Sequence, residues 1–232
     1  VGLLGLGLMP QALQRPDSTH LAWVSCVPLA FVPAAVAEVV RARRWGRGLR
    51  GHAPALAAAA VLVVPLFVIP HFTARTWLDL VKQSRSGDVF GYPVSYEGRR
   101  FYLGSPEVAA VAQRMLDEVG PQMAPGERLV VGTADLRFTP YSDAYLYHLL
   151  PEQEAGTRYV EMDPGMANAE GSGLAEEVAA ADWLVLSHVW DAWQEPNGSR
   201  EPGSDEPNRV VERSFCPVGD YGPYFEVYRR CR

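Results

Sequence analysis

Two long apolar segments dominate the first third of the sequence. The segment at 21–40 is broken in its apolar character only by Ser25 and Glu38, and the segment at 53–70 carries no charge. At about 1.5 Å per helical residue, twenty residues cover the roughly 30 Å hydrocarbon core of a bilayer. Because backbone groups in lipid must be satisfied within the segment, the pattern predicts a membrane α-helical hairpin of at least two transmembrane helices.

The loop between the two segments fixes the predicted orientation. Residues 41–52 read RARRWGRGLRGH and contain five arginines. Short arginine-rich loops stay on the cytoplasmic side, so the polar loop at 10–20 and everything after residue 70 should lie outside. Residues 1–9 are apolar but too short to span, and we interpret them as part of a further membrane helix whose beginning is missing; a genuine start at Val1 is the alternative. These features predict a multi-pass protein of the plasma membrane.

After the second apolar segment the pattern changes to shorter elements. Residues 76–85 place Trp77, Leu78 and Val81 on one face, which predicts an interfacial helix along the membrane surface. The remainder, 86–232, alternates strands and helices, so we predict an extracytoplasmic α/β domain with a mostly parallel sheet and a C-terminal antiparallel hairpin. Strands are expected at 94–103 (as a hairpin), 129–131, 157–161, 183–187, 209–215 and 224–230, and helices at 105–118, 143–150 and 174–181.

Charge separates the two parts of the chain and excludes one class of partner. Residues 1–75 have a net charge of +5, which leaves −11 of the overall −6 for the remaining residues. Nucleic-acid binding needs a basic surface, so the acidic domain predicts no nucleic-acid partner. The lipid bilayer is the partner that the apolar segments predict.

The predicted domain carries candidate ligand-binding residues after three of its strands. Ligands of parallel sheets bind beyond the carboxyl ends of the strands, where Asp135, Asp163, His188 and Asp191 follow. Three carboxylates and a histidine could converge on a metal or a sugar. The alternative is that the aspartates only end strands and cap turns. No phosphate-binding glycine loop follows the first strand, which argues against a nucleotide site. No cofactor is predicted, and a divalent metal stays an open alternative.

The cysteines leave one pairing open. Cys26 falls in a predicted span, where it acts as a small apolar residue. A bridge between Cys216 and Cys231 would close a loop of about fifteen residues and stabilise the fold by about 3 kcal/mol. The predicted hairpin argues against it: with a turn at 219–222, the two sulfurs would lie on the order of tens of Å apart. We therefore favour the hairpin without the disulfide.

The polar loop at 10–20 holds a second candidate cluster. Arg15, Asp17 and His20 precede the first predicted span, at the level where a lipid-linked phosphate would sit. Arginine suits a phosphate, and an aspartate with a histidine can move a proton. We predict that Arg15 binds the phosphate and that Asp17 and His20 orient it. The alternative is a helix cap with an arginine at the lipid headgroups.

Several stretches resemble one known family. QRPDSTHL leading into an apolar segment, FYLGSPEVAAVAQRML, LVVGTADLRFTPYSDAYLYHLLPE, TRYVEMDPG and FCPVGDYGPYFEVYRR resemble the C-terminal part of polytopic bacterial glycosyltransferases of the GT-C type, relatives of protein O-mannosyltransferases and aminoarabinose transferases. The resemblance implies transfer of a sugar from a polyprenyl-phosphate carrier at the outer membrane face. The family's catalytic acids lie in an early outer loop that this sequence does not contain, so no catalytic residue is assigned. A membrane-anchored binding or scaffold module without catalysis is the alternative.

Overall fold

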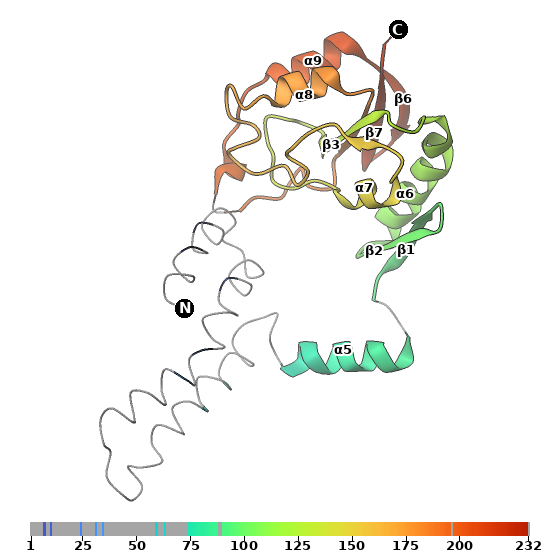
Figure 1. The fold of residues 1–232 in the computed structure, drawn as a ribbon, viewed down its shortest axis with the longest axis vertical. Coiled ribbons are helices and arrows are strands. Elements are labelled where there is room, and N and C mark those ends of the chain that lie inside the picture. The colour runs from blue at the N-terminus through green and yellow to red at the C-terminus, as the bar shows by residue number, and fades with distance from the viewer. Residues whose placement is uncertain are drawn as a thin grey trace, which may run out of the picture. The chain divides into compact units, whose positions relative to one another are not determined.

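The computed structural model describes residues 74–87, 90–195 and 197–231, together with seven single positions between residues 7 and 63 (Figure 1). The chain divides into two compact units, Val1–Asp88 and Val89–Arg232. The predicted segments at 1–9, 10–20, 21–40, 41–52 and 53–70 lie outside the described ranges. The same holds for the predicted phosphate-binding residues Arg15, Asp17 and His20, and for Cys26.

The first unit contains the helix α5, Ala74–Ser86. Asp79 forms ion pairs with Arg75 and Lys82, at the one-turn spacing that lets helical side chains meet. Trp77 and Leu78 are exposed. The helix that the sequence predicts at 76–85 is thus present and begins slightly earlier.

No helix within 74–87, 90–195 and 197–231 is long and apolar enough to cross a membrane. The longest in these ranges, α6, has 14 residues, which is about 21 Å of helix against about 30 Å of hydrocarbon. This finding contradicts the predicted fold class, in which a membrane hairpin precedes the α/β domain, and it contradicts the predicted multi-pass location in the plasma membrane.

The second unit is built on a mixed sheet. Its strand order is β4-β3-β5-β7-β6, and a separate hairpin pairs β1 with β2 across the turn Glu97-Gly98. The β3–β4 and β3–β5 pairs are parallel, whereas β5–β7 and β6–β7 are antiparallel. The sheet is therefore evenly mixed rather than mostly parallel. The strands are β1 Tyr92–Tyr96, β2 Arg99–Leu103, β3 Arg128–Thr133, β4 Glu154–Ala155, β5 Trp183–Ser187, β6 Phe215–Tyr221 and β7 Phe225–Arg230.

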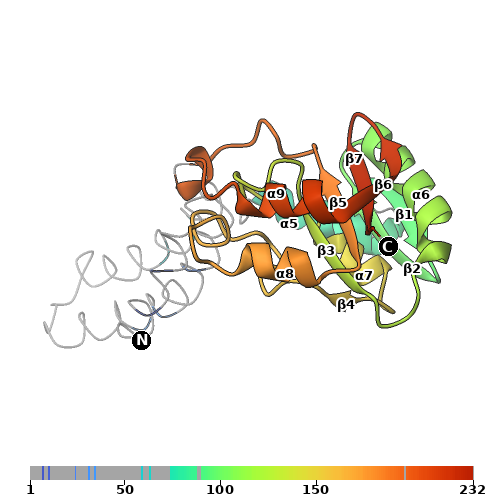
Figure 2. The same cartoon turned by 90° about the horizontal axis from the view of Figure 1, so that it is seen from above.

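Helices cover both faces of this sheet and bury two apolar cores (Figure 2). Along β3, Leu129 and Val131 enter the core shared with α6 and α7, while Val130 enters the core shared with α8 and α9. This alternation follows from the two-residue repeat of a strand. The helices are α6 Pro106–Val119, α7 Tyr145–Leu149, α8 Leu174–Ala180 and α9 Glu206–Ser214, with short 3-10 turns at Gly120–Gln122 and Gly198–Arg200.

Two predicted strands are wrong. Residues 209–215 belong mainly to α9, which begins after Asp205, has Pro207 in its first turn and buries Val210 and Val211. Proline is favoured in the first turn of a helix because its missing N–H would be unpaired there. Residues 157–161 form irregular backbone, and the edge strand is the two-residue β4 just before them.

The disfavoured disulfide is present. Cys216 and Cys231 are bonded, with their Cα atoms 5.2 Å apart. The β6–β7 turn lies between Tyr221 and Phe225 rather than at 219–222. This later turn places Cys216 opposite Arg229 at the open end of the hairpin, where Cys231 also lies. The hairpin and the bridge therefore coexist, and the argument that separated the two sulfurs is wrong.

Candidate functional site

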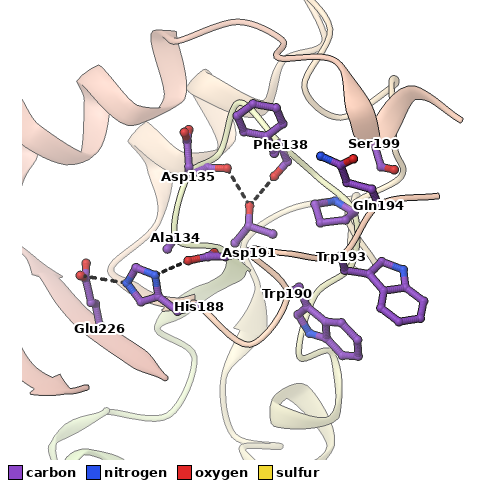
Figure 3. Close-up of a pocket in the computed structure, with 12 residues that line it drawn as sticks. Ala134, Asp135, Phe138, His188, Trp190, Asp191, Trp193, Gln194, Ser199 and Glu226 are labelled. Carbon is purple, nitrogen blue, oxygen red and sulfur yellow. Dashed lines mark hydrogen bonds and ion pairs between the residues drawn. The ribbon is translucent and has the colours of Figure 1, made fainter. Parts of the chain in front are cut away.

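A cavity of about 400 Å³ lies at the carboxyl ends of β3 and β5. The chain leaves β3 toward β4 on one side of it and returns to β5 on the other. Such a reversal of strand order opens a crevice, and ligands of open α/β sheets bind there. The walls are the loop at 134–140 after β3, the loop at 188–199 after β5, and Glu226 at the start of β7 (Figure 3).

Asp135 is held rigidly at one side of the cavity. Its carboxylate accepts hydrogen bonds from the guanidinium of Arg137, at 2.6 Å for Nη2, and from the Asn208 amide at 2.8 Å. The Thr133 hydroxyl lies 3.0 Å from the Asp135 carbonyl oxygen and fixes the backbone there. The hydrogen bond from Arg137 is the main reason why the pKa of Asp135 falls from 3.8 to about 2, against the opposing effect of burial. Asp135 is therefore ionised at neutral pH.

His188 lies between two carboxylates (Figure 3). Its Nδ1 is 2.6 Å from Asp191 Oδ2, and its Nε2 is 3.2 Å from Glu226 Oε1. Burial alone lowers the pKa of His188, but the hydrogen bonds to Asp191 and Glu226 outweigh it, so the net pKa is raised above 6.5. Both ring nitrogens of a protonated histidine donate, which matches the two carboxylates.

Glu226 is also held from β7 itself. The Tyr228 hydroxyl donates to its Oε2 at 2.5 Å, which is the range of a charge-assisted hydrogen bond. This bond is the main cause of the lowered pKa of Glu226, with His188 adding to it and burial opposing it.

Aromatic side chains form the wall on the side away from Glu226 (Figure 3). The rings of Trp190 and Trp193 meet edge to face at 6.0 Å, and Tyr141 packs against both, at 5.1 Å and 6.0 Å. These are favourable aromatic geometries. Trp193 is nevertheless 47% exposed, so part of its surface is available to a ligand.

Hydrogen bonds stabilise the loop that carries the tryptophans. The Glu195 backbone N–H donates to the Ser199 hydroxyl at 2.9 Å, and the Asn197 amide donates to the Glu195 carboxylate at 2.8 Å. Glu195 and Ser199 are both buried. These bonds restrain the backbone just after Trp193.

The structure brings three of the four predicted domain residues together. Asp135, His188 and Asp191 line the cavity, whereas Asp163 lies outside its walls, where its carbonyl oxygen accepts the N–H groups of a tight turn. Sequence reasoning missed Glu226 and the two tryptophans. The run WDAW just after the strand at 183–187 was the available signal for the tryptophans.

No group of three or more His, Cys, Asp and Glu side chains in the described part of the chain is arranged to hold a metal ion. The residues that line the cavity supply hydrogen-bonding groups and two tryptophan side chains.

Comparisons with known proteins add no relative. No model of a protein family matches the chain, and neither does any curated protein or solved structure. The resemblance to GT-C glycosyltransferases gains no support from them.

Proposed function

We propose that the α/β domain at 89–232 binds a carbohydrate in the cavity between the β3 and β5 loops. The observation that carries the proposal is the exposed face of Trp193 beside ionised carboxylates at the crevice of the sheet. A sugar ring has C–H faces that pack on an aromatic ring and a rim of hydroxyls that need hydrogen-bond partners. The cavity supplies both kinds of contact at one place.

Each wall has a role in this proposal. Trp193 packs on one face of the sugar ring, supported by Trp190 at 6.0 Å. Asp191 and Glu226 accept hydrogen bonds from sugar hydroxyls, and the Gln194 side chain supplies an amide donor and an acceptor. A cavity of about 400 Å³ falls in the size range of small-molecule sites.

Charge compensation favours a neutral sugar over an organic cation. Aromatic rings beside carboxylates also suit a cation, but these carboxylates have partners. Arg137 pairs with Asp135 at 2.6 Å, and His188 contacts both Asp191 and Glu226. A cationic ligand would compete with these contacts, whereas a polyol uses the remaining lone pairs of the same oxygens.

The proposal keeps one part of the expectation drawn from sequence. The family resemblance implies a sugar ligand, and a binding module is the alternative that needs no catalytic residue in this chain. The proposal concerns binding by the described domain and leaves out the membrane-bound transfer reaction.

Calorimetric titration of the full chain tests the proposal. The probes are glucose, galactose, mannose and N-acetylglucosamine, with choline as the cationic comparison. We expect at least one sugar to bind and Trp193→Ala to weaken its binding about tenfold or more, because a tryptophan that a ligand covers often contributes much of the binding energy. Trp77→Ala is the matched control, since Trp77 is 50% exposed and belongs to the other unit. Binding of choline alone, or equal losses in both variants, would overturn the proposal.

A further inference from the structure

A second cavity of about 340 Å³ adjoins the first. The two share three lining residues, Ala134, Asp135 and Glu226. The second cavity continues from these residues toward α9 and β7, where Asn208, Glu212 and Tyr228 line it. The two cavities are therefore neighbours across one pair of carboxylates.

The second cavity is polar and is built from side chains that are already positioned. Asn208 donates to Asp135 at 2.8 Å, and the Asn208 side-chain oxygen accepts the Leu136 N–H at 3.0 Å. Tyr228 donates to Glu226 at 2.5 Å. These bonds hold both shared carboxylates from the side of the second cavity, where Arg137 also binds Asp135. His188 holds Glu226 from the side of the first cavity.

We propose that the bound carbohydrate extends from the first cavity across Asp135 and Glu226 into the second, so that the site takes a saccharide of at least two units. This inference rests on the proposed carbohydrate binding and names its substrate class. One sugar packs on Trp193, the linkage lies against the two shared carboxylates, and the next sugar meets Asn208, Glu212 and Tyr228.

The shared carboxylates act as hydrogen-bond acceptors in this arrangement. Glycoside cleavage by a carboxyl pair needs one member protonated as the acid, with a raised pKa. The pKa of Asp135 and that of Glu226 are both lowered, by Arg137 and by Tyr228 respectively. Both groups are ionised at neutral pH and therefore accept bonds from hydroxyls on either side of the linkage.

The test compares single sugars with disaccharides on the full chain by calorimetry. The probes are the four sugars above and their disaccharides maltose, cellobiose, lactose, mannobiose and chitobiose. We expect the best disaccharide to bind about tenfold more tightly than its single sugar. Glu212→Trp, which fills the second cavity from an exposed position on α9, should remove this gain and leave the single-sugar affinity unchanged.

Arg213→Trp is the matched control, because Arg213 is the next exposed residue of α9 and does not line the second cavity. It should keep the disaccharide gain. Equal affinities for one and two units, or a full gain in Glu212→Trp, would overturn the extended site while leaving the proposed function intact. Absence of binding by every sugar in the panel would instead overturn the proposed function, and with it this inference. Retained single-sugar binding shows that Glu212→Trp is folded.

Discussion

The Nδ1 atom of His188 lies 2.6 Å from Oδ2 of Asp191. This contact closes the first turn of the loop after β5. On the other side of the ring, Nε2 faces Glu226 on β7 at 3.2 Å, and the His188 backbone N–H donates to the Tyr224 carbonyl at 2.8 Å. The imidazole thus fastens the loop that carries both tryptophans to the neighbouring strand.

The contacts of His188 make stability depend on pH near neutrality. The pKa of His188 is raised above 6.5 in the folded protein, so the native state binds more protons than the unfolded chain near that pH. The stabilisation is complete below the unfolded pKa and is lost as pH rises through the folded value. We expect the melting temperature to fall between about pH 6 and about pH 8.

His188→Gln isolates this contribution. The variant cannot titrate, so its melting temperature should change less over the same pH interval, as measured by calorimetry. His148→Gln is the control, because His148 is exposed and its hydrogen bond from Arg99 is accepted by the backbone carbonyl rather than by the ring. An equal pH response in His188→Gln and the parent chain would contradict the assignment.

The elements that sequence predicted well are those with a strong local pattern. WLVLS is apolar up to its final serine, and it forms β5 over the predicted 183–187 with all five residues buried. Ser105 caps α6 as expected, its side chain accepting the Val108 N–H. At 209–215 we predicted a strand, but Pro207 lies just before this range in the first turn of α9, a position typical of a helix start.

Some of the site residues could be predicted from sequence, whereas others reach the site only through tertiary structure. His188 and Asp191 follow a recognisable strand, so their place at its carboxyl end could be inferred. Glu226 reaches the same edge only because β7 runs antiparallel to β5 with Phe225 opposite Ser187, and no local pattern specifies that register. Asp163 was misplaced because the segment before it is irregular backbone rather than a strand.

The disulfide gives a prediction about stability. The bridge between Cys216 and Cys231 spans a sequence separation of 15, for which the chain-entropy model gives about 3 kcal/mol. We expect the double variant Cys216→Ser/Cys231→Ser to lower the free energy of unfolding by about that amount in urea titrations. Non-reducing mass analysis should first show the parent chain lighter by two hydrogen atoms. An unchanged unfolding midpoint in the double variant would refute the prediction.

Gly203 gives a second prediction about stability. A Cβ atom there would overlap the Asn168 carbonyl oxygen, and the Gly203 N–H donates to the Arg137 carbonyl at 2.8 Å. Gly203→Ala must therefore move backbone next to the cavity, and we expect a loss of about 1–3 kcal/mol. In Gly104→Ala the new Cβ meets nothing within 4 Å, so its unfolding midpoint in urea should stay near that of the parent. Similar midpoints for both variants would contradict this account.

The lowered pKa of Asp135 gives a prediction about stability in acid. Its pKa is lowered from 3.8 to about 2, chiefly by Arg137, so the native state binds fewer protons than the unfolded chain in this range. The stabilisation is present above pH 3.8 and is lost as pH falls through the folded pKa. Asp135→Asn should therefore lower stability near pH 6 and flatten its decrease toward about pH 3. The effect should be modest, because the Asp135 side chain is 36% exposed and solvent screens its ion pair with Arg137.

Asp117→Asn is the matched control: Asp117 accepts one bond, from Gln113, without a cationic partner among the described residues. Only the Asp135 variant should also weaken sugar binding, since only Asp135 borders the cavities; weaker binding in both variants would place the effect outside the site.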